Sequence, residues 1–169
     1  LHRMGATGPG FIGVHAVHLT AADIELLATH GGHVVHCPIS NMKLGSGIAP
    51  VSALLAGGVN VALGTDGAAS NNRLDLFGEM RIAALLAKVA TGDPAMLPAQ
   101  QALAAATLAG ARALGLDKQV GSLEAGKDAD FVVLSGDPLS VYTNVLQTWV
   151  EGRKVFDRSD PKDYLTAVG

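Results

Sequence analysis

The chain has 169 residues, about half of them hydrophobic, which is enough for a sizeable core without disulfides. Its net charge of -3 and its lack of a basic block argue against nucleic acid or an anionic membrane as the main partner, and no apolar run reaches the roughly 18–20 residues of a membrane span. The single cysteine and the absence of a visible signal peptide predict a cytoplasmic location, while the opening Leu1 indicates a start within a longer protein or processing.

The first third of the chain predicts a strand, a helix and a second strand. Residues 11–18 read as a short, largely apolar buried strand. Thr20, followed three residues later by Asp23, is typical of a capping box, so a helix is expected to begin there and to end near the glycines at 31–32. Residues 33–36 then predict the second strand.

The next segment contains many Gly, Pro, Ser and Asn residues and then becomes apolar again. Residues 37–47 have the composition of a loop. Pro50 is expected to start a short helix that runs through Ala56, because proline suits the first turn of a helix. Residues 59–64 predict a third strand, and Asp66 lies just beyond its end.

Two longer helices are expected after the third strand. Residues 73–89 place Leu74, Phe77 and Met80 on one apolar stripe, and residues 98–114 form an Ala/Leu-rich segment that starts with proline. The alternation of strands and helices implies parallel strands in an α/β architecture. This order alone does not separate a barrel from an open sheet.

The texture changes after about residue 120. Residues 129–134 and 145–150 are β-like, and residues 151–154 are expected to form a hairpin turn that leads to Val155 and Phe156. We therefore predict an α/β segment over residues 1–119 and a small β-rich segment over residues 120–169.

Two polar residues stand where predicted strands end. His15 lies toward the end of the first strand, and Asp66 follows the third. The carboxyl ends of parallel strands host the site in α/β folds, so His15 and Asp66 could meet there as ligands of a divalent metal. Each residue also has a simpler interpretation, because a lone strand histidine is more often a packing residue and an Asp-Gly pair is often a turn.

Further polar side chains lie near the same strand ends. His36 ends the second strand, and it could equally pack against a loop. Ser40, Asn41, Ser70 and Asn71 could bind a substrate, or they could cap helices and stabilise loops. The second role is the commoner one for each of these residues taken alone.

The exact amino-acid sequences of several runs are more specific to a family than their hydrophobic periodicity. The runs are HAVHL at 15–19, HCPISNMKL at 36–44, GIAP at 47–50 and LGTDGAASNN at 63–72. In this order they resemble the methylthioadenosine/S-adenosylhomocysteine deaminases and the related triazine hydrolases of the amidohydrolase superfamily, over roughly residues 8–130. The run GSLEAGKDADF at 121–131 resembles the return to the small β domain that is found across amidohydrolases.

The resemblance implies a metal-dependent TIM (β/α)₈ barrel, of which this chain would supply about strands 6–8 together with a small β appendage. Asp66 matches the family's strand-8 aspartate, which binds the metal and takes a proton from water, and His15 matches the strand-6 histidine that stabilises the developing oxyanion. The metal is expected to be zinc, with iron as the alternative. The resemblance also implies that Ser70 and Asn71 shape the rim behind Asp66, and we predict four substrate-binding residues: Ser70, Asn71, His36 and Asn41.

The implied activity is hydrolytic deamination of a small molecule, a purine nucleoside thioether, with release of ammonia. The family's strand-1 His-x-His, its strand-5 histidine and its proton-donating glutamate are not in this sequence, and a complete barrel needs about 250 residues. We therefore expect the chain to form homo-oligomers or to associate with the missing part of the barrel. The tail from Gly136 to Gly169 looks more like imidazolonepropionase- or peptidase-like amidohydrolases. Triazine or cyclic-amide hydrolysis, or a catalytically incomplete fragment, therefore remain alternatives.

Overall fold

A computed structural model describes residues 2–138 and 140–163. The C-terminal end of the predicted β-rich segment, residues 164–169, lies outside the described residues, as do Leu1 and Leu139. The elements, in chain order, are η1 (His2–Met4), β1 (Ile12–Val14), α1 (Ala21–His30), β2 (His33–His36), α2 (Pro38–Leu44), α3 (Val51–Ala56), β3 (Asn60–Leu63), α4 (Leu76–Thr91), α5 (Ala99–Ala106), α6 (Leu108–Ala113), β4 (Phe131–Leu134), β5 (Val145–Val150) and β6 (Arg153–Asp157).

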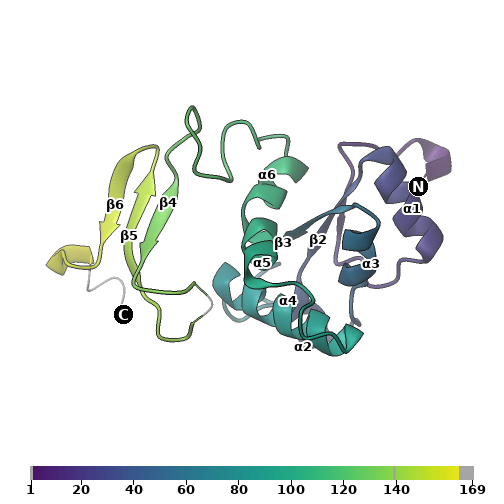
Figure 1. Ribbon diagram of the computed structural model, residues 1–169, viewed down its shortest axis with the longest axis horizontal. Helices are drawn as coiled ribbons and strands as arrows, with labels where there is room; N and C mark the ends of the chain where they lie inside the picture. Colours follow the sequence, from purple (N-terminus) through teal and green to yellow (C-terminus); the bar gives the residue numbers. More distant parts are fainter. Residues whose placement is uncertain (1, 139, 164–169) are drawn as a thin grey trace.

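The described chain is an α/β structure with two separate three-stranded sheets. Strands β1, β2 and β3 are parallel and adjacent in that order, as predicted from the alternation of elements. Strands β4, β5 and β6 form an antiparallel sheet. Figure 1 shows the antiparallel sheet at one end of the molecule and the parallel sheet, with α1 and α3, at the other. No helix among the described residues is both long enough and apolar enough to span a membrane.

The predicted capping box at the start of α1 is confirmed. The Thr20 hydroxyl accepts a hydrogen bond from the Asp23 backbone N–H, and the Asp23 carboxylate accepts one from the Thr20 backbone N–H. These two bonds satisfy donors that the first turn of a helix leaves unpaired. Gly31, with φ of 70°, ends the helix in the left-handed conformation. The cap thereby fixes where the chain turns from α1 into β2.

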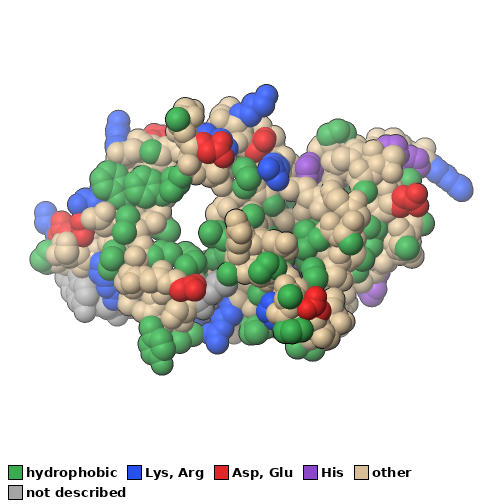
Figure 2. Space-filling model, viewed as in Figure 1, with side chains coloured by type: hydrophobic (Ala, Val, Ile, Leu, Met, Phe, Trp, Pro, Cys, Tyr) green, Lys and Arg blue, Asp and Glu red, His purple; other side chains and the backbone are tan. Residues whose placement is uncertain are grey.

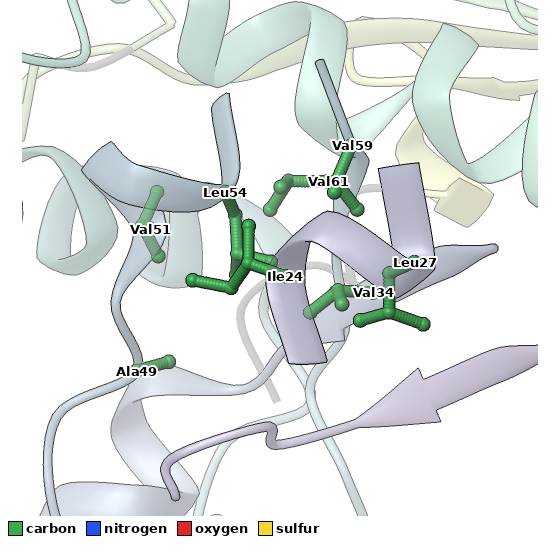
Figure 3. Packing of buried hydrophobic residues seen from close by; sticks show 8 residues of the cluster. All are labelled: Ile24, Leu27, Val34, Ala49, Val51, Leu54, Val59 and Val61. Atoms are coloured by element: carbon green, nitrogen blue, oxygen red, sulfur yellow. The ribbon is translucent and has the colours of Figure 1, made fainter. Parts of the chain in front are cut away.

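The main hydrophobic core lies between the parallel sheet and helices α1 and α3. Val34 of β2 and Leu54 of α3 are both fully buried. Figure 3 shows Ile24 and Leu27 of α1 directed toward them, with Val61 of β3 beside the same cluster. A second cluster joins Leu63 of β3 to helices α4 and α5. The two clusters hold the carboxyl ends of the strands in fixed relative positions.

Residues 37–47 contain a helix where a loop was predicted, so that prediction is wrong. Helix α2 starts with Pro38 in its first turn and ends at Leu44, and Gly45 caps it with φ of 64°. Its polar residues Ser40 and Asn41 are 0% and 1% exposed. The loop prediction failed because these side chains form hydrogen bonds inside the protein. These bonds offset the cost of burying the polar face of the helix.

Other boundaries differ for local reasons. Strand β1 ends at Val14, because His15 and Ala16 have φ of 69° and 52°. Helix α4 starts three residues later than predicted, where the Asp75 carboxylate accepts a hydrogen bond from the Phe77 backbone N–H. The predicted 98–114 helix is divided at Thr107, whose φ of -128° and ψ of -88° are not helical.

The antiparallel sheet has the strands predicted at 129–134 and 145–150, although β4 begins two residues later. The hairpin turn consists of Glu151 and Gly152, both with positive φ, and β6 begins at Arg153, so the predicted four-residue turn was too long. Phe131 of β4 stacks on Trp149 of β5, with ring centroids 5.6 Å apart. This stack lies across neighbouring strands and stabilises their pairing.

Replacement of Leu54 should test the main core. Leu54→Ala removes a fully buried side chain and leaves a cavity, so we expect a loss of about 2–5 kcal/mol in the free energy of unfolding. Leu85→Ala, at a position of α4 that is 50% exposed, should change it by less than about 0.5 kcal/mol. Urea denaturation measures both variants, and equal losses would contradict this description of the core.

Candidate functional site

The candidate site is centred on Asp66, three residues beyond the end of β3. Asp66 adopts φ of 59°, which is rare for a residue with a side chain. Its Oδ2 accepts hydrogen bonds from the hydroxyls of Ser40, at 2.7 Å, and Ser70, at 2.6 Å. One hydroxyl comes from α2 and the other from the loop that follows Asp66. The carboxylate is therefore held from two sides.

These hydrogen bonds set the ionisation of Asp66. Donation by the Ser70 and Ser40 hydroxyls, together with the Gly67 backbone N–H, lowers the pKa of Asp66 to about 2. The ionised form accepts these bonds better than the protonated form, which explains the direction of the shift. Asp66 is consequently a carboxylate throughout the neutral pH range. This is the form that can bind a cation.

His15 lies beside Asp66, as the order of the strands predicted. It follows β1 directly, with its backbone N–H donating to the Val35 carbonyl. Its Nδ1 is 2.8 Å from Oδ1 of Asn41, and its Nε2 is 3.8 Å from Oδ2 of Asp66. Because the Asn41 oxygen can only accept, the proton of neutral His15 lies on Nδ1. Nε2 is therefore the ring nitrogen that faces the Asp66 side of the site.

Helix α2 connects both strand ends to the loop after Asp66. Ser40 contacts Asp66, and Asn41 contacts His15. Near the end of the same helix, Lys43 Nζ donates to the Ala69 carbonyl, at 2.9 Å, and to the side chain of Asn72. The charge of Lys43 is thus used to hold the loop and not to pair with Asp66.

Asn71 lies behind the carboxylate and is 1% exposed. Its Nδ2 donates to the Thr65 carbonyl, at 2.8 Å, and to Oε1 of Glu79. Glu79 is fully buried in α4 and was not among the predicted site residues. A signal for it exists in the sequence, because Glu79, Ala83 and Ala87 recur every four residues on the buried face of α4.

His36 is not hydrogen-bonded to the group around Asp66. It is 2% exposed, and its Nδ1 has no hydrogen-bond partner among the described residues. It lines a mostly apolar cavity between α3, β3 and α5, together with Leu55 and Leu97. Burial, and then the proximity of His15, lower the pKa of His36 to about 4, so it is neutral at neutral pH.

The donor groups around Asp66 fit one part of a metal site. Carboxylate oxygens and imidazole nitrogens are groups that bind zinc or iron in proteins. Within residues 2–138 and 140–163, no group of three or more His, Cys, Asp or Glu side chains is placed to hold a metal ion. Figure 2 shows histidines gathered over the parallel-sheet end of the molecule. Asp66 therefore fits a metal as a contributing ligand within a larger set.

Comparison with known proteins identifies the family. Residues 1–155 match the model of the amidohydrolase family, and the chain belongs to this family. The chain is 56% identical over 134 residues to a 5-methylthioadenosine/S-adenosylhomocysteine deaminase of Moorella thermoacetica. The matched region covers 79% of the chain and 31% of the relative. It is 54% identical over 134 residues to a 5'-deoxyadenosine deaminase of Methanosarcina acetivorans, with the same coverage.

A solved structure agrees with these relationships. An adenosine deaminase from Xanthomonas campestris with bound zinc superimposes with a TM-score of 0.87 at 41% identity, over 98% of this chain and 42% of that protein. The chain spans about a third of the length of the curated relatives that it matches. The resemblance inferred from the sequence motifs is confirmed at the level of the family.

The hydroxyls on Asp66 lead to a prediction about pH. Loss of one donor in Ser70→Ala should raise the pKa of Asp66 from about 2 toward its ordinary value of 3.8. In the unaltered chain, the stabilisation from ionised Asp66 is present above about pH 4 and is lost as the pH falls toward 2. A ¹³C NMR titration of the Asp66 carboxyl carbon measures this pKa as the midpoint of the titration curve. Ser52→Ala, on α3, is the control, and an unchanged midpoint in Ser70→Ala would refute the assignment.

Proposed function

We propose that this chain forms the C-terminal part of a (β/α)₈ amidohydrolase barrel, with β1, β2 and β3 as about strands 6, 7 and 8. Residues 1–119 would be the barrel part, and residues 120–169 would belong to a small β-rich domain. The parallel order of the three strands supports this proposal, as does the position of His15 and Asp66 at their carboxyl ends.

The proposed activity is hydrolytic deamination of a purine nucleoside thioether of the methylthioadenosine or S-adenosylhomocysteine type, with release of ammonia. The observation that carries it is the ionised Asp66 carboxylate, held by two hydroxyls and facing the His15 imidazole at 3.8 Å. The name of the Moorella relative supports the thioether class, and the name of the Methanosarcina relative, a 5'-deoxyadenosine deaminase, supports a purine nucleoside more broadly.

Asp66 and His15 would have different roles in the reaction. Asp66 would bind the metal through its carboxylate and accept the proton of the attacking water. His15 would stabilise negative charge on the oxygen as the amidine carbon becomes tetrahedral, in the manner of an oxyanion-hole group. A bound zinc, or alternatively iron, would supply a water activated near neutral pH. The zinc of the Xanthomonas structure supports the choice of metal.

The four predicted substrate-binding residues differ in the hydrogen-bonding capacity that remains to them. Ser70 donates to Asp66, and Asn71 uses both ends of its amide within the chain. His36 Nδ1 and Asn41 Nδ2 are buried atoms without a partner among the described residues. We propose that Ser70 acts on the substrate through Asp66, whereas His36 and Asn41 retain donors or acceptors for a substrate contact.

The partner of this chain would be the remainder of the barrel or a second copy. In the described part of the chain, β1 and β3 are the outer strands of the parallel sheet, and each pairs on one side only. Val14, at the end of β1, is 51% exposed. Strand edges and apolar side chains of this kind are covered in stable proteins, which supports association.

Replacement of Asp66 tests the proposed function. In the protein that carries this chain together with the rest of the barrel, Asp66→Asn removes the proposed metal ligand and proton acceptor. We expect ammonia release from methylthioadenosine and S-adenosylhomocysteine to fall by on the order of 10²–10⁴-fold.

Asp128→Asn is the matched control, because Asp128 is exposed and lies outside the site. It should leave the rate of ammonia release unchanged. Unchanged ammonia release in Asp66→Asn would show that the assignment of Asp66 is wrong.

A further inference from the structure

Glu79 is a fully buried carboxyl group in α4. No Lys, Arg or His side chain forms an ion pair with it within the part of the chain that the structure describes. Its Oε2 accepts a hydrogen bond from the Ile39 backbone N–H, at 3.2 Å, and its Oε1 accepts one from Nδ2 of Asn71. Burial of a carboxyl group is unfavourable unless hydrogen bonds replace those it made to water. These two contacts supply such bonds, and the question is what the buried carboxyl group does through them.

The contact with Asn71 leads directly to the backbone beside Asp66. The same Nδ2 group that donates to Glu79 also donates to the Thr65 carbonyl. At the other end of the amide, Asn71 Oδ1 accepts from the Arg73 backbone N–H, at 3.1 Å. The orientation of the Asn71 amide is therefore fixed, and it presents one N–H to α4 and the other to the peptide that precedes Asp66.

That peptide is the one whose geometry matters most for the site. Asp66 has φ of 59°, a left-handed conformation that is unfavourable for a residue with a Cβ atom. Such a conformation persists only where surrounding contacts hold it. The hydrogen bond to the Thr65 carbonyl holds the peptide plane on the N-terminal side of Asp66, while Ser40 and Ser70 hold its side chain.

We propose that Glu79 is a positioning residue for Asp66, acting through Asn71 on the Thr65 carbonyl. The inference deepens the proposed function and rests on it only for the metal-binding role of Asp66. Both Glu79 oxygens act as acceptors, one for Ile39 and one for Asn71. A glutamine has a single side-chain acceptor and an NH₂ group, so it would place two donors against each other at one of these contacts.

The first experiment measures amide hydrogen exchange by NMR in the 169-residue chain. The backbone N–H groups of Ser70 and Asn71 donate to the Gly67 carbonyl and report on the loop. We expect Glu79→Gln and Asn71→Ala each to speed their exchange by about tenfold or more, through local opening. The amides of Ile24 and Leu54, which lie in α1 and α3, should keep their rates.

Glu25→Gln provides the matched control, because Glu25 is an exposed carboxylate on α1. It should leave all these exchange rates unchanged. If Glu79→Gln does not fold, Asn71→Ala decides the question, because it keeps the Glu79–Ile39 contact and removes the Asn71 side chain that connects Glu79 to the Thr65 carbonyl. Unaltered exchange of Ser70 and Asn71 in that variant would overturn the proposal.

The second experiment measures zinc affinity in the protein that carries this chain with the rest of the barrel. Groups that orient a metal ligand typically contribute 10–100-fold to affinity, so Glu79→Gln should raise the zinc dissociation constant by about that factor. If Glu79 acts through Asn71, the same substitution should have no further effect in an Asn71→Ala background. Additive effects of the two substitutions would overturn the proposed route.

The two experiments separate the possible failures. If the unaltered protein binds no zinc, or if Asp66→Asn binds zinc as tightly as the unaltered protein, the proposed function is wrong. The exchange rates of Ser70 and Asn71 then still decide whether Glu79 holds the loop. If zinc binding depends on Asp66 but not on Glu79, the proposed function stands and the positioning role of Glu79 is wrong.

Discussion

The hydrogen bond from the Ser40 hydroxyl to Asp66 joins two strand ends that the sheet alone only brings near each other. Strands β2 and β3 pair in parallel, so their carboxyl ends lie side by side, but a strand does not fix the side chains beyond its end. Helix α2 supplies that constraint. Successive residues of a helix point about 100° apart, so Ser40 can face Asp66 while Asn41 faces His15. Helix α2 thereby fixes the residue that follows β1, His15, and the residue beyond the end of β3, Asp66.

The burial of α2 makes these contacts mutually dependent. Ser40 is fully buried and Asn41 nearly so, and each would be unfavourable in that position without its partner. The partners, in turn, adopt left-handed backbone conformations that would not persist in an isolated turn. The polar residues of α2 therefore stabilise the positions of His15 and Asp66, and those residues stabilise the burial of α2. The positions of His15 and Asp66 therefore depend on these polar contacts as well as on the hydrophobic clusters beneath the strands.

The sequence predicted what depends on local pattern. The Thr20 cap, the parallel strands and the convergence of His15 with Asp66 follow from spacing and from chain order. Helix α2 did not, because Ser40 and Asn41 favour loops unless tertiary partners are present, and those partners are distant in the sequence. Glu79 was missed for a related reason: a charged residue on a helix is usually exposed, and the donors that permit its burial, the Ile39 N–H and the Asn71 amide, are brought to it only by the folded chain.

The means by which Asp66 is kept ionised also bears on what it can bind. A neighbouring lysine or arginine would lower the pKa of the carboxyl group as hydroxyls do, but it would cancel the negative charge that attracts a cation. Here the donors to Oδ2 are neutral hydroxyls, and the nearby Lys43 donates instead to Ala69 and Asn72. Asp66 thus combines a pKa of about 2 with a negative charge that no Lys or Arg side chain among the described residues pairs with. That combination suits a carboxylate that binds a metal ion better than one that only stabilises a turn, because a turn requires the hydrogen bonds but not the free charge.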